Sequence, residues 1–278
     1  MSYTSIYDHT VDGLAPLQRS LIAIEERVTQ QRAWNPDIVI GLVQTEDYAR
    51  AILSECFGVL EVPDDLDETV AARMKRQQIL DRDERDFHFL IGESALHHVV
   101  GSSEIMAEQI LALRDQLDAR PHVRIGIVPL NARFVGPAPE FVLHDTARVE
   151  SETATGEVVA TSPRDVALAA RLFDRLHGQA VYGQDATVVL TRVLALLFAV
   201  AGGTANAFAA TYTRPAGDAE NPPPRAPPGG RAARWSGRCP PGARGRRGPS
   251  RSRESAARRA RAFRSASAAG RRSPSLQT

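Results

Sequence analysis

The chain has 278 residues and carries 34 Lys or Arg against 33 Asp or Glu, a formal net charge of +1 that hides two unlike pieces. Residues 214–278 hold 16 Arg, no Lys and 3 acids, which leaves 18 basic and 30 acidic side chains for residues 1–213. The most apolar run, residues 193–201, is shorter than the roughly 20 residues that span a bilayer. The two cysteines, Cys56 and Cys239, fall in different pieces, which excludes a disulfide framework or a paired-cysteine metal site.

The N-terminus lacks the basic start and apolar run of a signal peptide, so we expect a cytoplasmic protein with no membrane segment. Residues 202–278 are rich in Arg, Pro, Gly and Ser and hold 10 of the 18 prolines. Such a segment buries too little apolar surface to offset its ordering entropy, which predicts a disordered tail. Two interpretations of it stay open: a selected basic segment, or a GC-rich gene translated in a shifted frame, which also yields Arg without Lys.

In the first hundred residues, apolar side chains at three- and four-residue steps predict helices, and alternating ones predict a strand. In chain order the expected elements are a helix over about residues 14–28, an extended segment over 32–41, helices over about 46–55 and 66–74, and a strand over 87–91. Thr45 is placed to cap the second helix. Pro36 indicates that the extended segment lies at a sheet edge or bends, because proline has no N–H to donate to a neighbouring strand.

The second half of the body predicts four more strands and three more helices. In chain order these are a helix over about 105–117, a strand over 123–127, short strands within 140–145, 148–152 and 157–162, and helices over 163–177 and about 185–199. Ser102 or Ser103 is expected to cap the first of these helices, and Ser162 with Pro163 to begin the second. The order predicts an α+β fold, with a mixed or antiparallel sheet of about five short strands packed with about six helices.

Three polar side chains stand at predicted strand ends or helix starts, and we expect them to line a cleft: Gln44, Tyr48 and Glu93. A phosphate cradle at the same turn is not expected. Glu46 and Asp47 already place negative charge in the first turn of the helix and would repel a phosphate from its N-terminus.

A metal-dependent hydrolase is the alternative function. Glu93 and His97 are four residues apart, and His98 adds a third side chain that could bind a metal. A catalytic zinc site takes three protein ligands and keeps one position open. The two histidines on either side of a glutamate that define the zincin pattern are absent. The other interpretation is a helix start with surface histidines, and we expect neither catalytic residues nor a cofactor.

Several segments in a fixed order carry a resemblance to a known family. They are IVIGLVQTEDYARAIL, VAARMKRQQILDRD, FHFLIGESALHHVVGSSEIMAEQILAL, HVRIGIVPL and ARLFDRL. Together they resemble the domain of unknown function that follows the helix-turn-helix in WhiJ-like, antitoxin-type regulators (XRE family) of actinobacteria. The resemblance covers about residues 33–197.

The resemblance implies a non-enzymatic regulatory module that binds a small partner protein encoded nearby or a small effector. A homodimer is a separate expectation. It divides the chain into a helix and lead-in over 1–32, a regulatory domain over 33–201 and the tail over 202–278. Two departures from the family pattern are Ile40, where the family tends to have proline, and the histidines at 97 and 98, where it often has arginine. The second departure argues against a metal site shared by the family.

Relatives in this family carry a Cro/repressor-type DNA-binding domain before the module. Here about 30 residues precede Trp34 and predict one helix, so we expect this chain to lack its own helix-turn-helix. The negative charge of residues 1–213 repels DNA. Contact with DNA is therefore expected only indirectly, or without sequence preference through the basic tail, where it would weaken steeply with salt.

Overall fold

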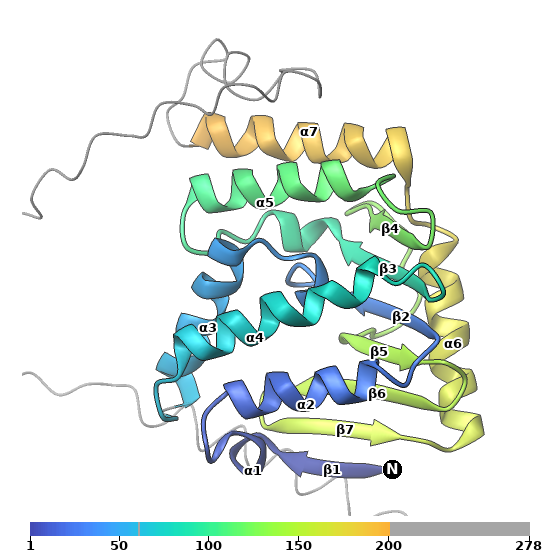
Figure 1. Ribbon diagram of the computed structural model, residues 1–278. Helices are drawn as coiled ribbons and strands as arrows, with labels where there is room; N and C mark the ends of the chain where they lie inside the picture. Colours follow the sequence, from blue (N-terminus) through green and yellow to red (C-terminus); the bar gives the residue numbers. More distant parts are fainter. Residues whose placement is uncertain (61, 201–278) are drawn as a thin grey trace, which may run out of the picture. The chain divides into compact units, whose positions relative to one another are not determined.

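The computed structural model describes residues 1–60 and 62–200, all of which belong to one compact unit. Its centre is a seven-stranded sheet in the order β1-β7-β6-β5-β2-β3-β4 (Figure 1). The strands are β1 (Ser2–Ser5), β2 (Gln30–Asn35), β3 (Asp86–Gly92), β4 (Val123–Val128), β5 (Phe141–His144), β6 (Arg148–Thr153) and β7 (Gly156–Ala160). β2, β3 and β4 run parallel, whereas β5, β6, β7 and β1 extend the sheet in antiparallel pairs.

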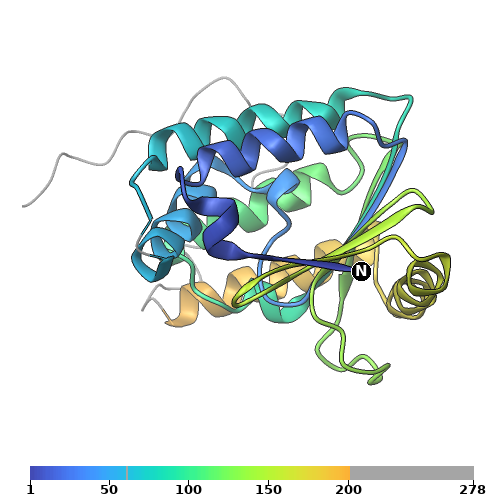
Figure 2. The same ribbon diagram turned by 90° about the horizontal axis from the view of Figure 1, so that it is seen from below.

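Helices cover both faces of this sheet. They are α1 (Ile6–Thr10), α2 (Ala15–Glu25), α3 (Glu46–Leu60), α4 (Leu66–Arg76), α5 (Ser103–Gln116), α6 (Pro163–His177) and α7 (Gly183–Val200), with short 3-10 turns η1 (Gly41–Val43), η2 (Gln77–Asp81) and η3 (Glu93–Leu96). Seen along the sheet, α6 lies on one side, and α2, α4, α5 and α7 lie on the other (Figure 2). The α+β class with a mixed sheet is therefore confirmed.

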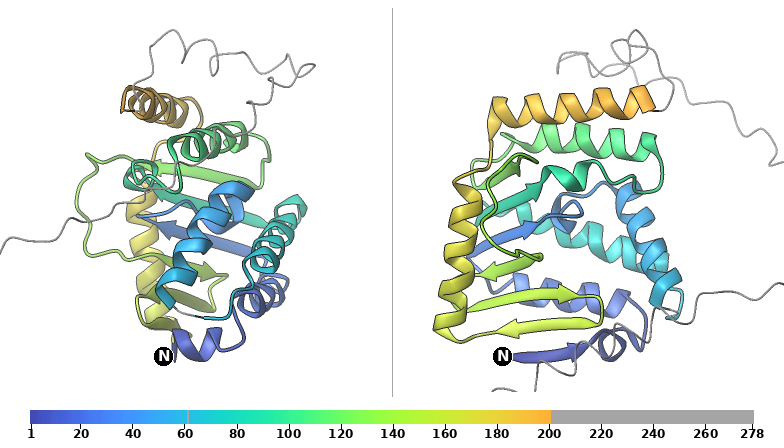
Figure 3. Two further views of the ribbon diagram at one scale, coloured as in Figure 1. Left: turned by 90° about the vertical axis from the view of Figure 1, so that its left-hand side faces the viewer. Right: turned by 180° about the vertical axis from the view of Figure 1, so that it is seen from behind.

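The alternation of apolar side chains explains how the layers pack. Phe89 and Ile91 of β3 join the main core beneath α5 and α7, while Leu90 between them joins a second core with Phe173 of α6. Neighbouring side chains of a strand point to opposite faces, so one strand serves both cores. α6 crosses the strands on its own face, as the view from behind shows (Figure 3).

Pro36 marks a bend and not a sheet edge. β2 is interior: it pairs with β3 on one side and β5 on the other, and it ends at Asn35. The missing N–H of Pro36 therefore falls just after the last paired residue, where no strand requires it. The edge alternative in the sequence prediction is wrong for this physical reason.

The structure also contains β1 and α1, which the sequence pattern did not predict. With four and five residues, both are too short to show a period. Together with β2, which overlaps the segment expected only to be extended, they raise the counts in the described residues to seven strands and seven α-helices, against about five and about six expected. β1 pairs with β7, and α2 packs on α4, so residues 1–32 complete the same sheet and helix layer as the rest.

Most predicted helix starts have the expected chemistry. Ser102 caps α5 by accepting a hydrogen bond from the backbone of Ile105, and Thr45 accepts one from Tyr48 at the start of α3. The disordered tail expected over residues 202–278 lies outside the described residues. Within the part of the chain that is described, each helix is too short or too polar to cross a lipid bilayer.

Candidate functional site

The sheet face toward α2 and α4 changes from apolar to polar across its strands. One row of paired residues runs through Phe87 of β3, Gln31 of β2, His144 of β5 and Arg148 of β6. Paired residues share a face, so this row belongs to a single surface. Its apolar end is packed by the main core. The polar end of this surface is formed by β5, β6 and β7, and the helices α2, α3 and α4 cover it.

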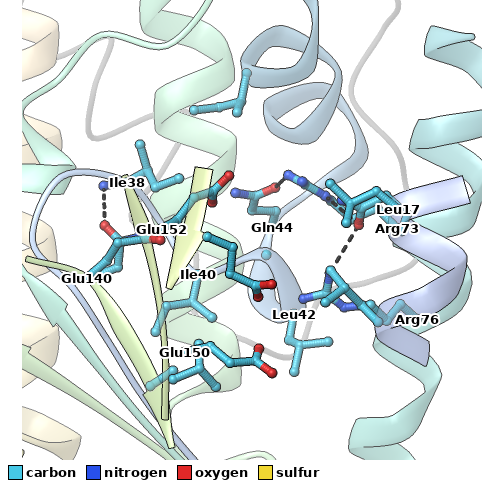
Figure 4. A pocket seen from close by; sticks show the side chains of 18 of the residues that line it. Leu17, Ile38, Ile40, Leu42, Gln44, Arg73, Arg76, Glu140, Glu150 and Glu152 are labelled. Carbon is cyan, nitrogen blue, oxygen red and sulfur yellow. Dashed lines mark hydrogen bonds between the residues drawn. The ribbon is translucent and has the colours of Figure 1, made fainter. Parts of the chain in front are cut away.

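A cavity of about 280 Å³ lies over the polar half of the sheet, between its strands and α2, α3 and α4. Figure 4 shows acidic side chains on the strand side and basic ones on the helix side. The polar residues that line it include Gln18, Glu25, Gln31, Asn35, Gln44, Arg73, Arg76, Glu140, His144, Glu150, Glu152 and Glu157. The apolar ones include Leu17, Leu21, Ile38, Ile40 and Leu42. A cavity with this mixed lining is typical of a small-molecule site.

A buried ion pair joins the helix wall of the cavity. Arg76 Nε lies 3.0 Å from Glu25 Oε2, and the two side chains are 11% and 4% exposed. Gln31 donates to the other carboxylate oxygen of Glu25 at 3.3 Å. Burial raises the pKa of Glu25 above its ordinary value, and the charge of Arg76 opposes that rise. These two charges neutralise each other.

A second set of paired charges lies on the strand side. His144 Nε2 is 3.2 Å from Glu150 Oε2, and Arg148 contacts the other oxygen of that carboxylate. Burial acts to raise the pKa of Glu150, but the hydrogen bond and charge of His144, together with Arg148, hold it below its usual value. Glu150 is therefore an ionised and compensated carboxylate.

Arg73 contributes a charge without an acidic partner. Its Nη1 donates to Gln44 Oε1 at 2.8 Å, and its Nε to Gln18 Oε1 at 3.4 Å. Within residues 1–60 and 62–200 it forms no ion pair with a carboxylate. Burial, followed by repulsion from Arg76, lowers the pKa of the Arg73 guanidinium to about 10, so it stays charged at neutral pH. Neutral amide oxygens hold this cation in place.

Glu140, just before β5, contributes the opposite charge. It accepts a hydrogen bond from the side chain of Asn35. Burial, followed by the charge of Glu152, raises the pKa of Glu140 to about 7. Glu152 is exposed. In the described chain neither carboxylate forms an ion pair with a basic side chain.

Two buried polar atoms of the cavity lining have neither a hydrogen-bond partner nor an ion-pair partner in the described chain. They are Gln31 Oε1 and His144 Nδ1, on side chains of residues that are each 5% exposed. Leaving such a group unpaired in the interior costs about 1–3 kcal/mol. The cavity thus contains buried polar atoms without partners and charges without ion pairs. A polar ligand can supply the missing hydrogen bonds and ion pairs.

The structure separates the three side chains expected to share a cleft. Gln44 lines the cavity and donates to the carbonyl of Val39 at 2.7 Å. Tyr48 is fully buried in the main core. Glu93 is buried at the end of β3, where Leu130 N–H donates to it at 3.0 Å and Arg192 pairs with it. Only Gln44 lies on the cavity, and a binding role for any of the three stays a prediction.

Of the three alternative metal ligands, His98 points away from the other two. His97 Nε2 lies 3.5 Å from Glu93 Oε1, whereas His98 directs its Nδ1 to the carbonyl of Asp37 at 2.9 Å. No group of three or more His, Cys, Asp or Glu side chains in the described residues is placed to hold a metal ion. The geometry does not favour the hydrolase alternative.

Sequence reasoning missed Arg73, Arg76, Glu140 and Glu150. A signal existed in β6, where Arg148, Glu150 and Glu152 alternate on one face. A charged face of a strand ordinarily faces water, so the pattern does not reveal that helices cover it.

We expect Tyr48→Phe to lower the free energy of unfolding by about 1–3 kcal/mol, because it leaves a buried backbone donor unpaired. The Tyr48 hydroxyl accepts from the N–H of Val39 at 3.2 Å, and both residues are fully buried. Urea denaturation measures the change. The matched control is Tyr3→Phe, which removes a hydroxyl from a residue that is 57% exposed and should change stability by less than about 0.5 kcal/mol. Equal effects of the two changes would contradict this role for Tyr48.

Comparison with known proteins identifies a family and little else. No curated protein matches the chain. Among solved structures, NucT from Helicobacter pylori matches with 14% identity and a TM-score of 0.36, over 66% of this chain and 98% of that one, a likeness too low to support any conclusion about function. The family described as "Domain of unknown function (DUF5753)" matches residues 18–192. This confirms the domain of unknown function, while the actinobacterial origin and the helix-turn-helix context stay predictions. The chain belongs to the DUF5753 family.

Proposed function

We propose that this chain is a non-enzymatic regulatory module that binds a small effector in the cavity between α2, α4 and the polar half of the sheet. The observation that supports it is that Arg73 and Glu140, each at least partly buried, line one cavity and form no ion pair within the described residues. Buried or half-buried charges without partners are costly for a fold. A ligand that supplies the missing partners offsets that cost, so binding stabilises the folded state.

A small effector fits this site better than a partner protein does. The unpartnered atoms of Gln31 and His144 lie on nearly fully buried side chains, out of reach of a protein surface. The volume of about 280 Å³ suits a small molecule. Four expectations stay predictions, because they concern other surfaces or the cellular setting: a small partner protein, a homodimer, an antitoxin-like role and a cytoplasmic location.

The position of α2 suggests how binding could be transmitted. α2 forms part of one cavity wall through Leu17, Gln18 and Leu21. It lies on the N-terminal side of the module, where the resemblance places the DNA-binding domain of relatives. A ligand that binds one conformation of α2 more strongly than another would increase the population of that conformation. Such a shift is the basis of an effector response.

Thermal unfolding in the presence of a library of amino acids, polyamines, organic acids and nucleosides tests the proposal. A ligand present at a hundredfold excess over its Kd should stabilise the fold by about 2.7 kcal/mol. That raises Tm by roughly 5–11 °C for a domain of this size. Leu21→Trp, which puts an indole in the cavity, should abolish the shift.

Leu168→Trp is the matched control, because Leu168 is 60% exposed on α6, on the opposite face of the sheet. It should respond to the ligand like the unaltered protein. The proposal fails if no compound raises Tm, or if Leu21→Trp keeps the full response.

A further inference from the structure

The uncompensated charges of the cavity have opposite signs and stand on opposite walls. Arg73 extends from α4 on the helix side, and Glu140 and Glu152 extend from the strand side (Figure 4). No ion pair within the described residues satisfies any of the three. The cavity therefore has one cationic end and one anionic end.

The other charged side chains at the cavity are paired within the chain, so they do not change the charge at either end. Glu25 pairs with Arg76, and Glu150 pairs with His144 and Arg148. Farther along the strands, Glu157 Oε2 lies 3.5 Å from His9 Nε2. Each of these carboxylates has a partner within the chain. What is left over is the Arg73 guanidinium on the helix side and the Glu140 carboxylate on the strand side, because Glu152 is exposed and lies close enough to Arg73 for its charge to act against the fall in the pKa of that guanidinium.

Apolar side chains line the space between the two ends. Figure 4 places Ile40 between Glu140 and the helix side, with Leu17 beside Arg73 and Ile38 beside Glu140. Contact with such side chains favours a methylene chain over a polar linker, because burial of apolar surface contributes about 25 cal/mol per Å².

The surroundings of each charge favour direct contact with a ligand. Gln44 and Gln18 orient the Arg73 guanidinium through neutral oxygens, which leaves its positive charge available for an anion. Asn35 orients Glu140 in the same way with a neutral donor. A pre-positioned charged group loses less freedom when a ligand binds, so it contributes more to affinity.

We infer that the effector carries a protonated amine at one end, bound by Glu140, and a carboxylate or other anion at the opposite end, bound by Arg73, with an apolar segment between them. This inference rests on the proposed function and specifies its ligand class. Because the charges face each other from two walls, an ω-amino acid represents this class better than an α-amino acid, whose charges share one carbon.

Four probes of matched length test the inference on the unaltered chain by calorimetric titration. They are 6-aminohexanoate, with both charges, hexylamine, with the cation only, hexanoate, with the anion only, and the neutral 1-hexanol. Each charge-assisted contact in a desolvated site should strengthen binding by about tenfold or more. The expected order is 6-aminohexanoate tightest, both singly charged probes weaker by at least about tenfold, and 1-hexanol weakest.

Two substitutions test which cavity residue binds which charged end of the ligand. Arg73→Gln should weaken binding of 6-aminohexanoate and of hexanoate and leave hexylamine unchanged. Glu140→Gln should weaken 6-aminohexanoate and hexylamine and leave hexanoate unchanged. Circular dichroism and thermal unfolding establish that each variant is folded, and the order of the four probes on the unaltered chain decides the question without either variant.

The outcomes separate this inference from the proposed function. If 1-hexanol or a singly charged probe binds as tightly as 6-aminohexanoate, and Leu21→Trp abolishes that binding, the cavity binds ligands but the two-ended class is wrong. If none of the probes binds at millimolar concentration, the two-ended class is also wrong. The library experiment then decides by itself whether the cavity binds a small molecule.

Discussion

Arg76→Leu is expected to destabilise the fold by about 3–5 kcal/mol, because it removes the main charge that compensates the buried carboxylate of Glu25. The Glu25 side chain is 4% exposed and lies 3.0 Å from Arg76 Nε. Arg76 also donates to Gln18 at 3.0 Å, so the substitution breaks a second contact on the wall formed by α2 and α4. Urea denaturation at neutral pH measures the loss.

Two controls separate the effect of an unpaired buried charge from that of a lost contact. Removing both charges with Arg76→Leu and Glu25→Leu should restore most of the stability, since apolar pairs replace buried ion pairs at little cost. Arg120→Leu breaks a surface pair with Asp81, whose side chains are 36% and 65% exposed, and should cost about 1 kcal/mol or less. The account of Glu25 is wrong if Arg76→Leu costs no more than Arg120→Leu, or if the double change is as unstable as the single one.

Glu140→Gln is expected to stabilise the protein at pH 8 and to have little effect at pH 5. The pKa of Glu140 is about 7 in the folded chain, against an ordinary value of 4.5. Between these values the folded state holds a proton that the unfolded state has released, so the stability of the unaltered protein falls as pH rises. Each pKa unit is worth about 1.4 kcal/mol. Because Glu140 is only partly buried, we expect about 1–3 kcal/mol instead of the full sum.

Urea denaturation at pH 5 and pH 8 measures this difference. The variant should lose less stability than the unaltered protein between the two pH values. Glu108→Gln, at an exposed position of α5, is the matched control and should follow the unaltered protein. If Glu140→Gln and the unaltered protein fall in parallel, Glu140 does not titrate near neutral pH. The inferred amine ligand should in turn bind more tightly at pH 8, where the Glu140 carboxylate is ionised.

The sequence predicted one residue of the cavity lining. Gln44 follows η1 and immediately precedes the cap of α3, and its predicted place on a cleft agrees with its place on the cavity. Tyr48 is one helical turn along α3, but its ring enters the main core, because that face of α3 is the one that packs inward. Glu93 follows β3 directly and does not line the cavity, because its carboxylate pairs with Arg192 of α7. Such partners come from distant parts of the chain, and no local pattern contains them.

The sequence by itself determined the elements and their apolar faces: the periods of α5 and α6, the alternation in β3 and β4, and the α+β class follow from neighbours in the chain. Only the tertiary structure decided which charged residues became interior. The contact between β1 and β7 joins residues more than a hundred positions apart, and so does the placing of α2 over β5 and β6, while α4 is more than sixty positions from those strands. A strand with charges on one face has the same local pattern whether water or a helix covers that face. The cavity and its uncompensated charges arise from that covering, which is a property of long-range packing.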